Sequence, residues 1–382
     1  MTGKSQIPTV AIVGTRGIPA RYGGYETGAE ELSIALVRRG FKVWVTCESN
    51  GMKIELNRTY RGVRLAYFPI IRAIRSLSET ILYDTLSVLW ATLVADIIYM
   101  QGYSGTLALI FPKLLHKTIL VNVDGLESKR RKFNRFLRVP YSALEILNTK
   151  IADYLIVDSH EIGAYYRRRF GVDSVYIPYG ISEIKPLDPA VLKRYGLKNG
   201  EYYLVIARLI PDNNIDLIIE GFKRSNSDKK LIIVGPLDNN AYVKRLLVQR
   251  DQKIVFLGGL YESRLQRALR KNCFAYIHGH EQGGTNPSLV EALSCRNIVL
   301  AIDVSFNREV AEDSALYFEK DPNDLKEKIR LLDSGLDTRH MVEKAYATYR
   351  RKYTPEIATE AFVQFVTDIR SRIESKPPIM AP

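Results

Sequence analysis

Short runs of aliphatic and β-branched residues alternate with segments of helical periodicity along nearly the whole chain. This order is typical of parallel strands joined by crossover helices. The runs are continuously apolar rather than alternating with polar residues, so we expect helices to cover both faces of each sheet. The predicted strands are 9–14, 42–46, 63–68, 96–100, 118–123, 154–158, 174–178, 202–207, 230–235, 253–258, 273–279, 297–302 and 315–318.

A stretch rich in proline and glycine, residues 179–201, separates these strands into two sets and predicts a hinge. With 382 residues the chain is long enough for two hydrophobic cores. We therefore predict an α/β protein of two doubly wound, Rossmann-like domains with parallel sheets, at 1–186 and 187–355. A helix at 356–374 is expected to pack back on the first domain, and 375–382 form a tail.

The chain carries 55 Lys and Arg against 42 Asp and Glu, a net charge of +13, which favours an anionic partner. Nucleic acid, a membrane surface and a phosphorylated substrate all fit this charge. Much of the excess lies in one basic and aromatic segment, residues 128–139, which fits either a solvated helix face or a patch for anionic lipid or an acceptor. The residues of this patch are Lys129, Arg130, Arg131, Arg135 and Arg138.

The three cysteines lack the spacing of metal ligands, which fits a reducing compartment. No apolar run at the start is long enough for a signal peptide. Asp84 and Asp96 interrupt the best candidate for a membrane span, residues 81–100. We expect a cytoplasmic protein, with peripheral attachment to the inner face of the cell membrane left open.

Glycines follow the first predicted strand, in a loop that leads into a predicted helix. Thr27 and Glu30 predict a capping box at the start of this helix. Amides at such a helix start favour an anion or a sugar hydroxyl, although a glycine-rich turn without a ligand is the alternative. The loop has neither the dinucleotide pattern G-x-G-x-x-G nor a P-loop, and an NAD dehydrogenase is therefore disfavoured.

Arg208 directly follows the predicted strand 202–207. Open α/β sheets bind ligands at the carboxyl ends of their strands, and a planar guanidinium suits a diphosphate. A surface arginine paired with a nearby carboxylate is an equal alternative.

The segment 278–295 gives the strongest local pattern: two glycines, Thr285 and Asn286 as capping residues, Pro287 at the first helical position, and an apolar helix. Main-chain amides around Asn286, Ser288 and Leu289 are expected to be free to bind a phosphate.

A carboxylate, Glu291, is expected one turn into this helix, where it would accept hydrogen bonds from ribose hydroxyls. His278 and His280 are expected on opposite faces of their strand and lack a third ligand, so no metal site is predicted.

The segments 14–27, 121–130, 207–215 and 283–292 together resemble the retaining glycosyltransferases of family four, and among them the bacterial rhamnosyltransferase-like branch. The resemblance covers nearly the full length. It implies the GT-B architecture, in which two Rossmann-like domains face a cleft, and a metal-independent hexosyltransferase without a cofactor. The implied partners are a nucleoside-diphosphate sugar and a glycan or lipid-linked saccharide acceptor.

By position, the resemblance assigns Arg208 to the donor diphosphate and Glu291 to the ribose. Gly258, in the loop 256–260, is assigned to the nucleobase. The remaining donor-binding positions are Gly23, Gly24, Asn213, Gly284, Thr285, Asn286 and Ser288.

Three positions depart from the family pattern. The first acid of the paired-glutamate motif falls on Gly283, with Glu281 two residues earlier. The lysine that assists the arginine falls on Asn213, and a histidine of the first domain falls on Asp124. We expect Arg208 to stabilise the leaving group, Asp124 to position or deprotonate the acceptor, and Glu281 to be the remaining acid near the transferred sugar.

The predicted function is transfer of a sugar with retention, with dTDP-rhamnose as the candidate donor. A UDP-hexose transferase and a nucleotide-sugar 2-epimerase of the same architecture are the alternatives. A protein that binds nucleic acid is disfavoured because no known recognition module is present.

Overall fold

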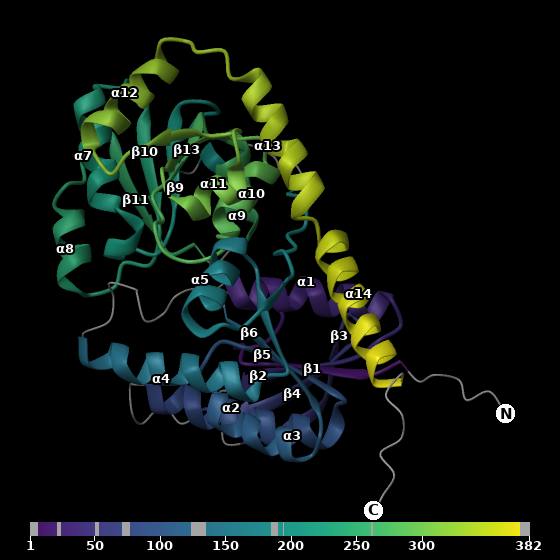
Figure 1. Ribbon diagram of the computed structural model, residues 1–382. Helices are drawn as coiled ribbons and strands as arrows, with labels where there is room; N and C mark the ends of the chain where they lie inside the picture. Colours follow the sequence, from purple (N-terminus) through teal and green to yellow (C-terminus); the bar gives the residue numbers. More distant parts are fainter. Residues whose placement is uncertain are drawn as a thin grey trace, which may run out of the picture.

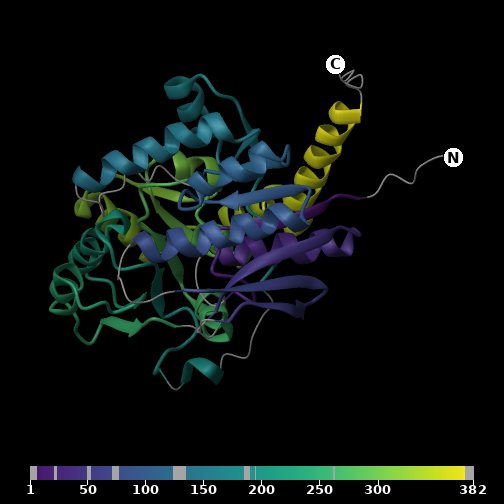
Figure 2. The ribbon, with the colours of Figure 1, turned by 90° about the horizontal axis from the view of Figure 1, so that it is seen from below.

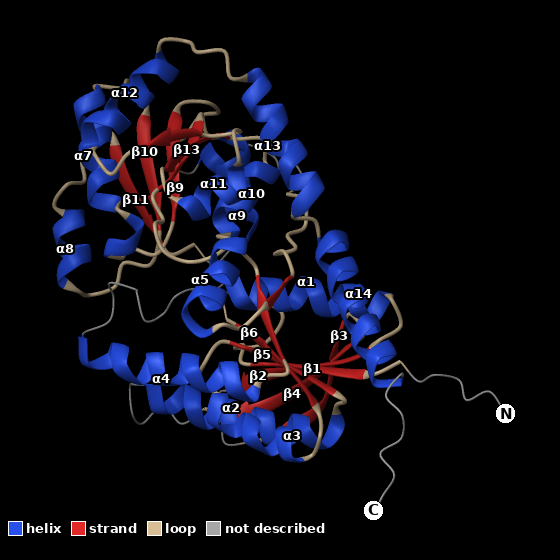
Figure 3. Cartoon of the chain, in the orientation of Figure 1, coloured by secondary structure: helices blue, strands red, loops and turns tan. Residues whose placement is uncertain are grey.

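The computed structural model describes residues 7–20, 24–49, 53–70, 77–123, 135–184, 190–193, 195–260 and 263–374. These residues form two α/β domains, each with a sheet that helices cover on both faces (Figures 1 and 3). The predicted fold class is confirmed.

The first sheet has eight strands in the order β3-β4-β2-β1-β5-β6-β7-β8, all parallel except for the antiparallel pair β3 and β4. The elements of this half are β1 (Thr9–Val13), α1 (Gly24–Arg38), β2 (Lys42–Ser49), β3 (Glu55–Tyr60), β4 (Val63–Pro69), α2 (Leu77–Val94), β5 (Ile97–Gln101), η1 (Thr106–Leu109), α3 (Ile110–Leu114), β6 (Thr118–Asn122), α4 (Arg135–Ile151), β7 (Tyr154–Val157), α5 (His160–Phe170) and β8 (Ser174–Tyr176).

The second sheet has six parallel strands in the order β11-β10-β9-β12-β13-β14. The remaining elements are α6 (Ala190–Lys193), β9 (Tyr202–Ile206), η3 (Pro211–Asn213), α7 (Ile215–Ser225), β10 (Lys230–Val234), α8 (Ala241–Leu247), β11 (Ile254–Gly258), α9 (Ser263–Asn272), β12 (Ala275–His278), α10 (Pro287–Ser294), β13 (Ile298–Ile302), α11 (Ser305–Ala311), β14 (Leu316–Phe318), α12 (Pro322–Asp333), α13 (Arg339–Lys352) and α14 (Pro355–Glu374).

Every predicted strand is present within one to three residues, but the sequence pattern missed β3. This strand reads ELNRTY, and its residues are exposed or half-buried because it lies at the edge of the sheet. An edge strand needs no apolar run, so periodicity did not reveal it. The predicted capping box is also wrong: α1 begins at Gly24, and Thr27 therefore lies inside the helix.

Each sheet separates two cores. In the first domain, α1 and α14 pack on one face, while α2, η1, α4 and α5 lie over the other. In the second domain, α9, α10 and α13 cover one face, and α7, α8 and α12 cover the opposite face. Both faces of the central strands are therefore dry, as their continuous apolar sequences predict.

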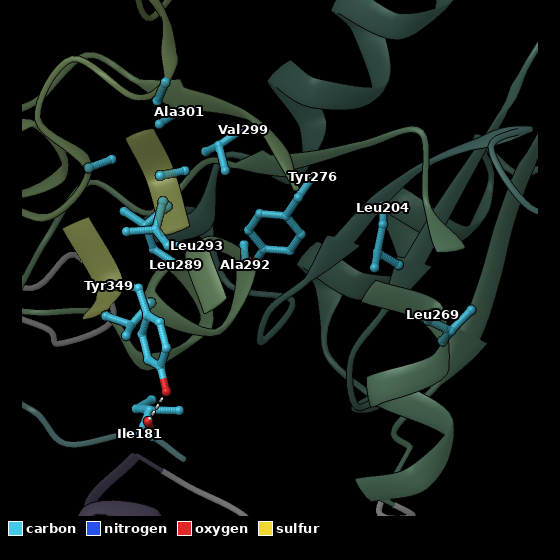
Figure 4. Packing of buried hydrophobic residues seen from close by; sticks show 14 of the residues in the cluster. Ile181, Leu204, Leu269, Tyr276, Leu289, Ala292, Leu293, Val299, Ala301 and Tyr349 are labelled. Carbon is cyan, nitrogen blue, oxygen red and sulfur yellow. Dashed lines mark hydrogen bonds between the residues drawn. The ribbon is translucent and has the colours of Figure 1, made fainter. Parts of the chain in front are cut away.

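The position of α10 is fixed by its apolar side. Leu289 and Leu293 lie beside Val299 of β13 and the ring of Tyr349 from α13 (Figure 4). The Tyr349 hydroxyl donates a hydrogen bond of 2.9 Å to the carbonyl of Ile181, in the segment that joins the two domains. The helix is thus held rigidly with its N-terminus at the carboxyl edge of the sheet.

The chain crosses between the domains twice, at residues 177–184 and again where α13 leads into α14. The two crossings touch: a Cβ built on Gly180 would lie 2.9 Å from Cα of Pro355, so a larger residue does not fit there. α14 then lies along α1, with the Phe362 ring 5.5 Å from that of Tyr99. Figure 2 shows this helix beside the first domain from below.

Among the described residues, no helix has the length and apolar character needed to cross a membrane.

Replacing Phe362 by alanine tests how α14 docks. The side chain is fully buried between α14 and the first sheet, so its removal should cost about 3–5 kcal/mol of unfolding free energy. Urea unfolding followed by tryptophan fluorescence measures the change. Gln364→Ala, at an exposed position of the same helix, is the control. Equal stability of both variants would show that α14 does not hold the first domain.

Candidate functional site

The main-chain amides of Ser288 and Leu289, at the start of α10, already have hydrogen-bond partners. Asn286 is the N-cap, and its side-chain oxygen accepts a hydrogen bond of 3.0 Å from the Ser288 amide. The Leu289 amide donates to the Asn286 carbonyl, also at 3.0 Å. The expectation that the Ser288 and Leu289 amides are free is therefore wrong.

Different amides, in the loop after β12, remain available. Within the described residues, the main-chain N–H groups of Gly284, Thr285 and Asn286 make no hydrogen bond. They directly precede Pro287 and the positive end of the α10 dipole, where an anion is stabilised. Among the described residues, the free amides therefore include that of Asn286, as the sequence suggested, but they begin at Gly284 and do not extend to Ser288 and Leu289.

The same loop contacts the first domain. The Thr285 hydroxyl donates a hydrogen bond of 2.6 Å to the Asp158 carbonyl, just beyond β7. A Cβ built on Gly284 would lie 2.1 Å from a carboxylate oxygen of Asp158, so only glycine fits. The carboxyl edges of the two sheets therefore face each other at this point.

Arg208 lies at the carboxyl end of β9, the strand next to β12. Its side chain is exposed and has no ion pair with any described carboxylate, so the alternative of a paired surface arginine is not found. Its carbonyl accepts a hydrogen bond of 2.6 Å from the Asn213 side chain. The Asn213 side-chain oxygen lies 2.6 Å from Nδ1 of His280. Asn213 therefore ties the arginine segment to the loop that carries the free amides.

The Ser288 side chain faces inward. Its hydroxyl donates to the carbonyl of Ile206 at 3.1 Å, and it lies 2.7 Å from the Tyr276 hydroxyl. The hydroxyl therefore joins α10 to the end of β9, which brings Arg208 and the α10 N-terminus into one cluster.

Glu291 has a buried partner that the sequence did not reveal. Its carboxylate lies 2.5 Å from Nη2 of Arg270, whose side chain is 2% exposed, whereas that of Glu291 is 25% exposed. Arg270 Nη2 also donates to the Ser288 hydroxyl at 2.8 Å. One guanidinium thus fixes two side chains one turn apart on α10. Helix α9 carries several basic residues, so no local pattern singled out this arginine.

Glu281 is buried and already has protein partners. Its carboxylate accepts a hydrogen bond of 3.1 Å from the Asn214 side chain and forms an ion pair with Lys320. Lys320, which the sequence did not suggest, also lines an open hollow of about 420 Å³ beside η3 and α7. A role of Glu281 at the transferred sugar stays a prediction.

Gly258 ends β11 with a φ of +75°, a backbone conformation that glycine adopts readily. Its carbonyl accepts a hydrogen bond of 3.0 Å from the Gly235 amide. Gly24 is the first residue of α1. Gly23, Asp124, Lys129, Arg130 and Arg131 lie outside the described residues, as do the side chains of Arg135 and Arg138 in α4.

The two histidines lie closer together than expected. Their ring centroids are 6.2 Å apart, because residues two apart in extended chain share a face, so the expectation of opposite faces is wrong. Burial, with a smaller contribution from Arg270, lowers the pKa of His278 to about 3. Across the described part of the chain, no three His, Cys, Asp or Glu side chains gather as a metal site.

The first domain places polar side chains at the same edge. Gln101 ends β5, Asn122 ends β6, and both are buried beside a cavity of about 40 Å³ that Asp158 also lines. Within the described residues, Gln101 Oε1 and Asn122 Oδ1 accept no hydrogen bond. A polar residue at the carboxyl end of each strand was the available sequence signal.

A carboxylate of the second domain caps a helix of the first. Glu309 of α11 accepts hydrogen bonds from the Ser159 hydroxyl at 2.6 Å and from the His160 amide at 2.7 Å, at the N-terminus of α5. Because a carboxylate is stabilised at a helix N-terminus, this contact helps to hold the two domains facing each other.

Comparison with known proteins divides the chain in the same way. Residues 191–348 match the family model described as glycosyl transferases group 1, and residues 7–182 match a domain of unknown function, DUF1972. Over 131 residues the chain is 32% identical to alpha-1,3/1,6-mannosyltransferase ALG2 of Kluyveromyces lactis. That match covers 32% of this chain and 25% of the relative.

Solved structures share the fold over nearly the full length. Sucrose-phosphate synthase of Thermosynechococcus elongatus is 16% identical, with a TM-score of 0.78 over 96% of this chain and 100% of that one. Anabaena HepE in complex with UDP is 14% identical, with a TM-score of 0.72 over 94% and 100%. A glycosyltransferase from Rickettsia africae is 15% identical, with a TM-score of 0.70 over 96% and 99%.

His278 makes the fold sensitive to acid. Its pKa is lowered on folding, so the unfolded chain binds a proton near pH 6.5 that the folded chain does not bind until about pH 3. The contribution of His278 to the unfolding free energy is therefore complete above pH 6.5 and is lost as the pH falls toward 3. Between pH 7 and pH 5 the His278→Phe variant should lose about 2 kcal/mol less unfolding free energy than the natural chain. Urea unfolding at the two pH values measures this loss. His340→Phe, at an exposed histidine, should leave the loss unchanged; an unchanged loss in both variants would contradict the assignment.

A double-mutant cycle tests the Arg270–Glu291 pair. Arg270→Met and Glu291→Gln each leave one partner uncompensated, so the cycle should give a coupling free energy of about 1–3 kcal/mol from urea unfolding. The exposed pair of Arg296 and Glu343, 3.1 Å apart, is the control and should couple by less than about 1 kcal/mol. Equal coupling in both cycles would refute a special role for the buried guanidinium.

Proposed function

Starting from the glycosyl transferases group 1 domain at residues 191–348, we propose that the chain transfers a sugar from a nucleoside-diphosphate donor to a glycan or lipid-linked saccharide acceptor. The donor occupies the carboxyl edge of the second sheet. The acceptor enters from the first domain, whose sheet edge faces it.

The observation that carries this proposal is the cluster of free donors at one edge. In the part of the chain that the structure describes, the amides of Gly284, Thr285 and Asn286 make no hydrogen bond and the Arg208 guanidinium makes no ion pair. These groups come from neighbouring strand ends. Together they match the negative charge of a diphosphate. Glu291 lies one turn further along α10 and keeps a partly exposed carboxylate for the hydroxyls of a ribose.

These groups act on the leaving diphosphate. As the bond from the anomeric carbon to the phosphate oxygen breaks, negative charge grows on that oxygen, and Arg208 and the amides stabilise it. We propose that the acceptor hydroxyl attacks from the same face, so that the anomeric configuration is retained, and that no metal is required. Asp124 as the residue that positions the acceptor, and Glu281 as an acid near the sugar, remain part of the proposal.

The proposed donor is dTDP-rhamnose, since the residue in the position of the family's lysine is the neutral Asn213. UDP-hexoses are the alternative, because Anabaena HepE is solved with UDP and with UDP-glucose. A thermal-shift panel of dTDP, UDP and GDP sugars, followed by transfer assays with the best donor, separates them. Product formed without any acceptor would indicate an epimerase.

Arg208→Ala should lower kcat/KM for transfer by about 10²–10³-fold, because one preorganised charge on the leaving group is lost. The melting temperature should stay the same, since the side chain is exposed and makes no ion pair with described residues. Assays of sugar transfer with the best donor measure the effect.

Arg250→Ala, at an exposed arginine after α8, is the matched control and should keep full activity. Transfer by Arg208→Ala at the natural rate would overturn the assignment of the diphosphate site.

A further inference from the structure

The short helical segment formed by η1 and α3 turns an apolar stripe to the solvent. Leu107, Ile110, Phe111, Leu114 and Leu115 are all exposed, and Leu114 is 70% exposed. Their spacing of three, four, seven and eight residues is that of one helix face. Apolar residues at such positions normally face a core, whereas the buried side of this segment is formed by other residues, among them Ala108 and Pro112.

The neighbouring helix α2 extends this surface. α2 contacts both η1 and α3, and its outward residues include Leu82 and Leu93, the latter 78% exposed. Among its described side chains the sole charged group is Asp84, which is buried and accepts a hydrogen bond from Ser104. We call the exposed apolar residues of α2, η1 and α3 the α2–α3 face.

The α2–α3 face lies away from the candidate site. Figure 1 shows α2 and α3 at the end of the first domain opposite to the second domain, and Figure 2 shows these helices from below. They cover the sheet face opposite to α1 and α14. The face is therefore accessible while the candidate site is occupied.

The rim of this face is basic. Lys113 lies in α3, and Lys117 follows two residues after Leu115; residues 106–117 contain no acidic residue. Lys150 is exposed on α4, a helix that contacts η1. Asp153 pairs with Lys113 and offsets its charge, so Lys117 and Lys150 supply the positive charge of the rim, while the exposed Asp96 accepts a hydrogen bond from the Thr9 amide.

We propose that the α2–α3 face is a docking surface for an anionic membrane, lying in the interface without crossing it. An apolar stripe with basic residues at its margin is stabilised by burial among acyl chains and by attraction to anionic headgroups. A symmetric pairing of two copies would bring the basic rims together, which disfavours self-association through this face. The inference goes beyond the proposed transfer reaction and does not depend on the donor.

Co-sedimentation with vesicles tests the surface on the full chain. The natural protein should bind vesicles of phosphatidylcholine with about 30 mol% phosphatidylglycerol, more weakly at high salt and more weakly to pure phosphatidylcholine. Leu93→Ser combined with Leu114→Ser should reduce the partition coefficient at least about tenfold, because two exposed apolar side chains no longer enter the interface. Val248→Ser, at an 82% exposed residue after α8, should bind like the natural protein.

Two results would overturn the proposal: no binding of the natural protein to anionic vesicles, or equal binding of the double variant. A dimer of the natural protein that the double variant dissociates in sedimentation velocity, without vesicle binding, would assign the face to a second copy instead. Since both leucines are exposed, the double variant should keep its melting temperature and its transfer rate to a water-soluble acceptor. That rate separates failure of this inference from failure of the proposed function.

Discussion

The hydrogen bond from the Thr285 hydroxyl to the Asp158 carbonyl is the contact on which the site depends. It joins the loop before α10 to the end of β7 in the other domain, at 2.6 Å and out of water. Gly284 allows this approach because a Cβ would collide with Asp158. With the loop held there, the amides of residues 284–286 stay outside the helix ladder. The Glu309 carboxylate at the start of α5 supports the same relative position of the domains.

The sequence predicted the strands and fold class well because parallel strands buried on both faces must be continuously apolar. It missed β3, where an edge position removes that requirement. In the site, Arg208 and the capping pattern of Asn286 and Pro287 were visible because strand ends and helix starts have local signatures. Arg270 and Lys320 were not, since each acts through a residue distant in sequence. Which amides are free could not be predicted from the sequence either, because this depends on which amides donate to the Asn286 side chain and carbonyl.

The basic residues behind the net charge of +13 differ in their burial and partners. Arg208 is exposed and unpaired with described carboxylates at the sheet edge, where it suits a diphosphate. Arg270 is buried, forms an ion pair with Glu291 and donates a hydrogen bond to Ser288. Lys117 and Lys150 lie near an apolar face at the far end of the first domain, where Lys113 pairs with Asp153. One basic composition therefore includes a candidate diphosphate ligand, a structural pair and a surface rim, which differ in their burial and partners.

A crystal structure of the protein with dTDP or UDP tests the central claim most directly. We expect the diphosphate within hydrogen-bonding distance of the Gly284, Thr285 and Asn286 amides and of the Arg208 guanidinium, with the ribose hydroxyls at Glu291. A diphosphate bound elsewhere, with these amides still unliganded, would contradict it.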